Sequence, residues 1–535
     1  MVKNKFNTFF YSKQLRIIIG FFIALSCAFL SLELMFVTHS SDINILYSNG
    51  PLLITMFVSF ICSFILYLKT HENILKFCKN NVLYFIMLLF ISLIVLRKFY
   101  VVEVSMFEQS WNLDGLLFNP HQIIFFSFSY LGLLYVFIFL FSIIKSWLKN
   151  FVNSLDKWDK KVYFIATIIS TFIIIIAYSF NENWYLQYDK VYSMDSGWFF
   201  SNMLPYITYY TIRHPLISVF IFPVWAIVTV FVNHVLTGNL AITVGAIILQ
   251  IINSQLLIII GLLLKKITEN KMVFIMYMIS FPTILFTLFL EKYQLCVFLI
   301  VLYVFTLCVT KKKSEVSLIS AASIMPTSSF IGVSELFTNE KFINKIKKII
   351  KIIIFSILIF ICLGRIYVFK FGFEEINNTR EFFITEKYSV AQKVIATTTM
   401  IKNAFIALPS GIDIDGKYMW QDLKSSFSIV SLFIILIIIL GAVVNRKMLF
   451  TKIAAIWFIF SFLLFVLLNW CPNESPLFTL YFSWALIPLF IFGIDYIIKK
   501  LNLNYNIVYM VVIFFMIIVN LTTIIDIIKF MISLE

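Results

Sequence analysis

The stretch IIIGFFIALSCAFLSLELMFV, residues 17–37, decides the fold class of this chain. An apolar run of about 20 residues is long enough to cross the roughly 30 Å hydrocarbon core of a bilayer as an α-helix. Similar runs recur along all 535 residues, of which 61% are hydrophobic and only 13% are charged. No soluble protein of this length could bury so much apolar side chain in its core. The sequence therefore predicts an all-α polytopic membrane protein.

The apolar runs predict about thirteen transmembrane helices. The expected crossings are residues 17–37, 52–68, 82–96, 123–144, 162–180, 240–264, 272–290, 295–309, 350–363, 427–444, 449–468, 477–498 and 507–525. Lys-rich connections belong in the cytoplasm by the positive-inside rule, which places the N-terminus inside and the C-terminus outside. Two further apolar stretches are expected not to cross. Residues 216–235 would form a juxtamembrane helix in the first large external loop, and residues 316–337 a re-entrant or shallow segment of irregular backbone.

The net charge and the cysteine content exclude several kinds of partner and cofactor. The net charge of +15 comes mostly from lysines between apolar runs, so it indicates membrane orientation and not nucleic-acid binding. The seven cysteines lack metal-ligand or paired spacing and fit small buried apolar residues. The first apolar run is longer than a signal-peptide core and is expected to remain as an uncleaved span in the cell membrane.

The order of these features predicts four parts. Residues 1–161 would form an N-terminal four-span extension, and residues 162–364 a core that carries an external loop at 181–239. A second external loop would cover 365–426, ahead of a C-terminal four-span bundle at 427–535.

The candidate functional residues gather at the outer ends of the expected crossings. The loop segment YDKVYSMDSGWFFSNMLPYITYYTIRHPLISVFIFP, residues 188–223, holds two aspartates, a tryptophan and an Arg-His-Pro between apolar runs. Glu291 and Lys292 follow the crossing at 272–290 on the same side. Each such group costs roughly 2.5–3.5 kcal/mol if it is stranded at bilayer depth. We therefore expect a reactive site at the outer membrane surface.

Two of these segments carry a family resemblance. MDSGWFFSNM (194–203) and RHPLISVF (213–220) resemble the first external loop of type C glycosyltransferases, the superfamily of protein O-mannosyltransferases and lipid A aminoarabinose transferase. Glu291-Lys292-Tyr293-Gln294 resembles the second acidic element of that superfamily, and residues 473–489 are similar to segments of bacterial members. The resemblance covers about residues 162–498. Ser196 stands where the family usually has Glu, so no metal cofactor is expected, although a divalent cation stays an alternative.

The resemblance implies an enzyme that moves a sugar from a polyprenyl-phosphate carrier to a glycan, lipid or protein acceptor outside the cytoplasm. Asp195 would be the general base. The substrate-binding residues implied are the cations Arg213, His214 and Lys292 at the phosphate, Glu291 at the acceptor or beside Lys292, and Trp198 around the sugar or prenyl chain. Asp189 is a further substrate-binding candidate.

Each residue also has a structural interpretation. Asp195 could cap a short helix, Arg213 could snorkel at the interface, and Glu291 could pair with Lys292 where two spans meet. Asp189 could be ordinary loop solvation, His214 could bond a nearby carbonyl, and Trp198 could belong to an interfacial aromatic belt.

Two other functions stay open. A polysaccharide polymerase or ligase with diphosphate-linked donors would direct attention to Arg380 and residues 370–426. A lipid-linked glycan flippase or transporter would be expected to show midplane charges or an inverted repeat.

Overall fold

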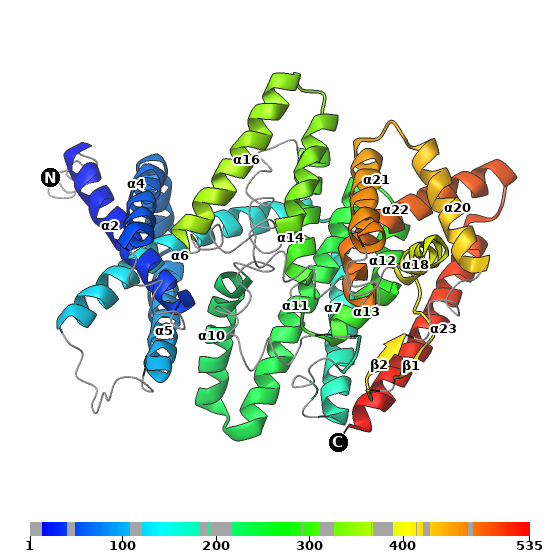
Figure 1. Ribbon diagram of the computed structural model, residues 1–535, viewed down its shortest axis with the longest axis horizontal. Coiled ribbons are helices and arrows are strands. Elements are labelled where there is room, and N and C mark those ends of the chain that lie inside the picture. Colours follow the sequence, from blue (N-terminus) through cyan, green and yellow to red (C-terminus); the bar gives the residue numbers. More distant parts are fainter. Residues whose placement is uncertain are drawn as a thin grey trace. The chain divides into compact units, whose positions relative to one another are not determined.

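The computed structural model describes residues 13–39, 49–107, 120–181, 184, 190–192, 194, 217–291, 293–310, 326–364, 366, 389–413, 415–420, 429–468 and 475–534. Helices make up nearly all of these residues, and one short antiparallel hairpin accompanies them (Figure 1). The chain divides into two compact units, which are described separately below. Unit 1 comprises residues 1–156, 204–235 and 357–372, and unit 2 comprises residues 157–203, 236–356 and 373–535.

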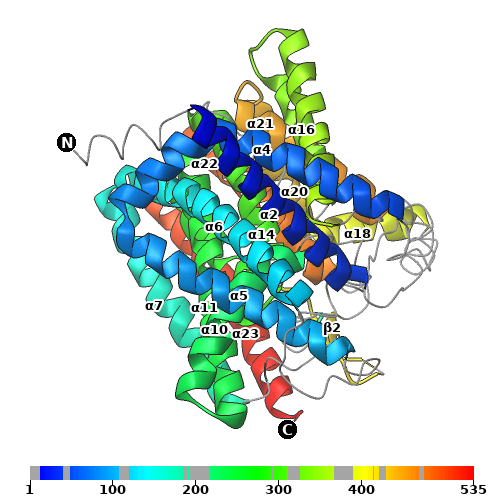
Figure 2. The same cartoon turned by 90° about the vertical axis from the view of Figure 1, so that its left-hand side faces the viewer.

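Unit 1 is a group of packed helices. They are α2 (Lys13–His39), α4 (Asn49–Asn80), α5 (Val82–Phe107), α6 (Pro120–Ser154) and α10 (Ile217–Val235). Figure 2 shows α2, α4 and α6 side by side, and their buried core includes Tyr67, Leu134 and Tyr135. Gly132 allows α6 to approach α2, because a Cβ there would lie 2.6 Å from the Ser26 carbonyl oxygen.

Unit 2 holds the remaining elements. In chain order they are α7 (Lys157–Phe180), α11 (Gly238–Thr268), α12 (Lys271–Ile279), α13 (Phe281–Leu288), α14 (Tyr293–Phe305), η2 (Thr306–Thr310), η3 (Pro326–Phe337), α16 (Phe342–Cys362, whose last residues belong to unit 1), α18 (Val390–Asn403), β1 (Ser410–Ile412), β2 (Tyr418–Trp420), α20 (Ile429–Val444), α21 (Leu449–Phe462), η4 (Leu463–Leu467), α22 (Ser475–Leu501) and α23 (Tyr505–Ile532).

The helices define a multi-pass membrane protein. Within the described ranges, nine helices are long and apolar enough to cross a membrane, or ten if α12 and α13, bent by 55° at Ser280, form one broken span. Their outer faces carry large apolar side chains such as Phe57, Phe172 and Phe514, each more than half exposed, as expected for surfaces that meet lipid. All thirteen expected crossings coincide with helical segments, and the number that cross stays a prediction.

Two glycines bring α20 and α22 into close contact. A Cβ at Gly441 would lie 1.9 Å from the Leu489 carbonyl oxygen, and one at Gly493 would lie 2.1 Å from the Ile437 carbonyl oxygen. Small residues at a membrane helix interface let the backbones approach in this way. Any side chain larger than hydrogen would force these two helices apart.

The segment η3 is a 3₁₀ helix of 12 residues, far longer than the usual three or four. Irregular backbone was expected in this region, and its buried side chains, including Ser328 and Ile331, lie among α14, α21 and α22. The Ser328 hydroxyl lies 3.0 Å from the Cys296 sulfur, and Phe330 stacks on Phe460. The buried face of η3 thus packs on protein, which is the condition under which non-α backbone is tolerated at membrane depth.

Candidate functional site

Of the predicted site residues, Glu291 lies within the described part of the chain. The others fall outside the described residues: Asp189, Asp195, Trp198, Arg213, His214 and Lys292. The candidate site is therefore built from the segments that lead to these residues and from Glu291 itself.

The chain leading to Asp195 is fixed to the late hairpin. The Tyr418 amide donates to the Lys190 carbonyl at 2.8 Å, and the Tyr192 amide donates to the Tyr418 carbonyl at 3.0 Å. Tyr192 has no exposed surface, and Met194 is 1% exposed. Asp195 is the next residue in the sequence. The predicted catalytic loop therefore begins from a buried backbone anchor.

Three chain segments meet at Phe281, the first residue of α13. The Tyr192 and Phe281 rings are nearly perpendicular, with centroids 6.0 Å apart. The Phe281 amide donates to the Phe405 carbonyl at 3.1 Å. The Tyr192 hydroxyl also donates to the Ser410 hydroxyl at 2.6 Å, and burial raises the pKa of Tyr192 far above its ordinary value. The start of α13 thus joins the approach to Asp195 with the chain that follows α18.

Asn520 of α23 holds this junction together. Its Nδ2 donates to the Ile279 carbonyl at 2.8 Å and to the Phe405 carbonyl at 3.0 Å, and its Oδ1 accepts from the Ala407 amide at 2.9 Å. Asn520 is fully buried. The helix break at Ser280 and the turn and loop at 404–408 both leave backbone groups without helical partners. The side-chain amide of Asn520 between them supplies those partners.

The other end of α13 is held by two glutamines. Gln250 Nε2 donates to the carbonyls of Phe286 at 3.2 Å and Thr287 at 2.7 Å. Gln294 Nε2 donates to the carbonyls of Phe286 and Phe289, both at 3.0 Å. The last carbonyls of a helix have no partner within the helix, so these amides complete its final turn inside the protein.

Trp184 completes the same turn and leads to Glu291. Its Nε1 donates to the Leu288 carbonyl at 3.1 Å, and its ring stacks on Phe289 with centroids 5.5 Å apart. Glu291 follows this turn and is 1% exposed. The predicted second acidic group therefore sits on a buried turn that several side chains keep rigid.

The late loop contains a second buried ionisable residue. Helix α18 begins with a capping box between Ser389 and Gln392 and has exposed residues in its first half, while residues 398–408 are all buried. In Figure 1 it is seen nearly end-on, whereas α11 and α14 run from top to bottom, so the direction of α18 differs from theirs. Lys402 is 9% exposed, and burial lowers the pKa of its amine. The sequence predicted an external loop here and did not reveal this burial.

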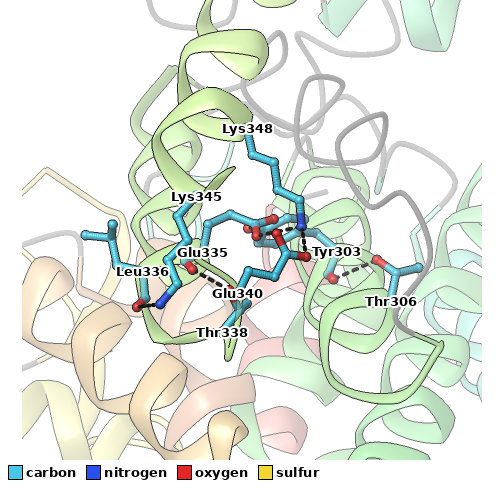
Figure 3. A network of polar contacts seen from close by, with 8 residues as sticks. All are labelled: Tyr303, Thr306, Glu335, Leu336, Thr338, Glu340, Lys345 and Lys348. Atoms are coloured by element: carbon cyan, nitrogen blue, oxygen red, sulfur yellow. Dashed lines mark hydrogen bonds and ion pairs between the residues drawn. The ribbon is translucent and has the colours of Figure 1, made fainter. Parts of the chain in front are cut away.

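Figure 3 shows a polar network at the end of η3 that the sequence interpretation also missed. The Glu335 carboxylate is 1% exposed and accepts from the Tyr303 hydroxyl at 3.2 Å. Lys348 lies 3.5 Å from Glu335 and 2.6 Å from Glu340. Burial raises the pKa of Glu335, and the Lys348 ammonium opposes that shift. Lys345 donates to the Leu336 carbonyl, so the network fastens η3 to the start of α16.

A third buried carboxylate joins α7 to α11. Asp159 has no exposed surface and lies 2.8 Å from Lys265 Nζ and 3.4 Å from Lys266 Nζ. The Lys265 ammonium also lies 5.5 Å from the centre of the Trp158 ring. These residues come from helix ends in Lys-rich connections, and their contacts fit a structural link between two helices.

Among the residues that the structure describes, no three His, Cys, Asp or Glu side chains gather closely enough to hold a metal ion. The expected lack of a metal cofactor stays a prediction. Comparisons of the chain with protein-family models, curated proteins and solved structures find no match.

Proposed function

We propose that this protein is a membrane glycosyltransferase that moves a sugar from a polyprenyl-phosphate carrier to an extracytoplasmic acceptor. One observation carries the proposal: the described chain that leads to Asp195 and the chain that leads to Glu291 both pack at a single short helix. The approach to Asp195 packs on Phe281 at the start of α13, and Glu291 follows the end of that helix. A helix of eight residues is about 12 Å long, which is the scale of a sugar-phosphate group and its acceptor.

The chemistry assigned to these residues is a single displacement. Asp195 removes the proton of the acceptor hydroxyl or amine as that atom bonds to the anomeric carbon, an effect worth about 10²–10⁴ in rate. The bond between the anomeric carbon and the carrier phosphate oxygen breaks, and the phosphate leaves with the electron pair. Arg213, His214 and Lys292 stabilise that charge, Arg through its planar fork and Lys through a point charge.

The other predicted residues position the substrates. The rigid turn suits Glu291 to orient the acceptor or to hold Lys292, which follows it in the chain. Trp198 would supply an apolar stacking surface, and Asp189 a polar contact to the sugar. In this proposal the site faces the outside of the cell membrane and the N-terminus lies in the cytoplasm, with no metal required.

The direct test measures transfer of a radiolabelled sugar from polyprenyl phosphate in membrane vesicles. Asp195→Asn should lower transfer by about 10²–10⁴ at unchanged protein level. Asp415→Asn, which alters an exposed aspartate in the turn between β1 and β2, should have no effect. Normal transfer by the Asp195 variant would remove the base assignment, and a wild-type protein that accepts no polyprenyl-phosphate donor would refute the function.

A second substitution tests the phosphate pocket. Arg213→Gln should raise the donor concentration needed for half-maximal transfer and leave acceptor use unchanged, because the guanidinium contacts the donor phosphate alone. A defect confined to the acceptor would contradict the pocket.

The burial of Lys402 favours one alternative, a polymerase or ligase that uses diphosphate-linked donors. Such an enzyme would use the late external loop, and Lys402 brings a buried positive charge to that loop. The same vesicle assay separates the two functions. Transfer from diphosphate-linked but not monophosphate-linked donors, with loss of activity in Arg380→Gln, would select the alternative.

A further inference from the structure

The last turn of α18 presents three polar side chains to the protein interior. Thr399, Lys402 and Asn403 are spaced at i, i+3 and i+4, so they share one face of the helix. Their exposed fractions are 1%, 9% and 0%. A hydroxyl and a carboxamide are therefore withdrawn from solvent, and Lys402 is mostly buried beside them.

These groups have no partner among the described residues. Thr399 Oγ1 and both polar side-chain atoms of Asn403 make no hydrogen bond within these residues. Burial lowers the pKa of the Lys402 amine, with no contribution from a charged or hydrogen-bonded neighbour. The neighbouring threonines behave differently. Thr397 donates to the Lys393 carbonyl at 2.7 Å and Thr398 to the Ile395 carbonyl at 2.8 Å, as helical threonines commonly do.

Such an arrangement is costly without a ligand. Buried polar groups in native proteins nearly always have partners, and a buried ammonium needs a counter-charge. A substitution that replaced these residues by apolar ones of similar size would remove the penalty. The presence of a cation and two hydrogen-bonding groups on one buried face therefore indicates a ligand that binds there.

The position of the face connects it to the candidate site. Phe405, three residues beyond Lys402, accepts from the Phe281 amide at the start of α13. The Phe281 ring also packs against Tyr192, on the chain that leads to Asp195. The end of α18 is thus fixed to the junction from which the predicted catalytic loop begins.

We propose that Thr399, Lys402 and Asn403 form an anion-binding site for a phosphate group. The Lys402 ammonium supplies the charge, while the Thr399 hydroxyl and the Asn403 amide donate to phosphate oxygens. The Asn403 carbonyl oxygen accepts from a hydroxyl next to that phosphate, as a sugar carries. On the basis of the proposed function, the ligand is the phosphate of the polyprenyl-linked donor.

Binding to the purified full-length protein in lipid nanodiscs tests this site without any transfer reaction. The probes are undecaprenyl phosphate and inorganic phosphate, each titrated against wild type, Lys402→Met and Lys393→Met. Lys393 is the matched control, since it lies on the same helix with its Nζ donating to the Leu467 carbonyl at 3.2 Å. We expect Lys402→Met to bind undecaprenyl phosphate about tenfold to a hundredfold more weakly, the loss of one charge-assisted contact, and Lys393→Met to bind like wild type.

A stability measurement without ligand separates binding from structure. Removing a buried charge that has no partner should leave the melting temperature of Lys402→Met equal to or above that of wild type. A lower melting temperature would show that Lys402 has a structural partner, and unchanged binding would show that it does not hold phosphate. Either result overturns the proposal.

The two probes distinguish the source of the phosphate. Binding of inorganic phosphate with no binding of undecaprenyl phosphate would overturn the assignment to a lipid-linked donor. Weakened undecaprenyl phosphate binding in Lys402→Met, in a wild-type protein that transfers no sugar, would support the anion site and refute the glycosyltransferase function. The two ideas can therefore fail independently.

Discussion

The ion pair between Glu335 and Lys348 allows a quantitative test of how η3 is held. Lys348→Met leaves a carboxylate that is 1% exposed and, among the described residues, hydrogen-bonded to the Tyr303 hydroxyl. Breaking a fully buried pair costs about 3–5 kcal/mol. Lys348 is 31% exposed and also pairs with Glu340, so solvent and that second carboxylate screen the pair. We therefore expect a loss of about 2 kcal/mol in the free energy of unfolding.

The substitution of Glu335 and the double variant complete a double-mutant cycle between positions 335 and 348. Glu335→Gln keeps an acceptor for Tyr303 and removes the charge, and should cost about 1 kcal/mol. The double variant should be little worse than Glu335→Gln alone, because no uncompensated carboxylate remains. The coupling energy between the two positions should then be about 1–2 kcal/mol.

Denaturant titration in mild-detergent micelles, followed by tryptophan fluorescence, measures these differences. Lys345→Met is the control, since Lys345 contacts a backbone carbonyl and not a carboxylate. If the loss in the double variant equalled the sum of the losses in the two single variants, Glu335 and Lys348 would have no interaction energy, and the reasoning would be refuted.

The raised pKa of Glu335 predicts how the free energy of unfolding changes with pH. Burial raises the folded-state pKa of Glu335 above its ordinary value of 4.5, so the folded protein holds the proton more tightly than the unfolded chain. Its contribution to stability is therefore full below 4.5 and is lost as pH rises through the higher folded-state pKa. The wild type should lose stability over that window, and Glu335→Gln should lose less.

Three other substitutions test contacts described above, each by the same titration. Gly493→Ala should cost about 2–3 kcal/mol, because its Cβ would lie 2.1 Å from the Ile437 carbonyl oxygen, while Gly50→Ala, with nothing within 4 Å, should change stability by less than about 0.5 kcal/mol. Asn520→Ala should cost about 3 kcal/mol and make the segment after α18 more sensitive to protease, since three backbone partners are lost together. Asp159→Asn should cost about 3 kcal/mol by leaving two lysines without their shared carboxylate, and wild-type stability in this variant would argue against a structural link.

The fold class could be predicted from the sequence because its signal is local. An apolar run long enough to span a bilayer is visible without any knowledge of its neighbours, and the runs coincide with helices such as α11 and α23. The break at Ser280 was less visible. Pro282 lies two residues after Ser280, yet a proline at the start of a helix and one within a span look alike in sequence.

The surroundings of the candidate site could not be predicted, because they are formed by contacts between residues far apart in the sequence. The residues of α18 were predicted to belong to an external loop, and only the packing of this helix against α20 and α22 shows that Lys402 is buried. Glu335 and Lys348 lie on different elements, and Gln250 caps carbonyls more than thirty residues further along the chain. A family resemblance can point to Glu291, but it cannot show which side chains make the turn beneath it rigid.

The unusual helix type of η3 has a consequence for its length. Twelve residues extend about 24 Å as a 3₁₀ helix and about 18 Å as an α-helix, so conversion between the two would shorten the segment by about one α-helical turn. Each residue would also rotate by about 20° relative to the one before it. Ser328 near one end and Glu335 near the other could not both keep their present contacts through such a change. Those two contacts together therefore hold η3 in the longer, 3₁₀ form.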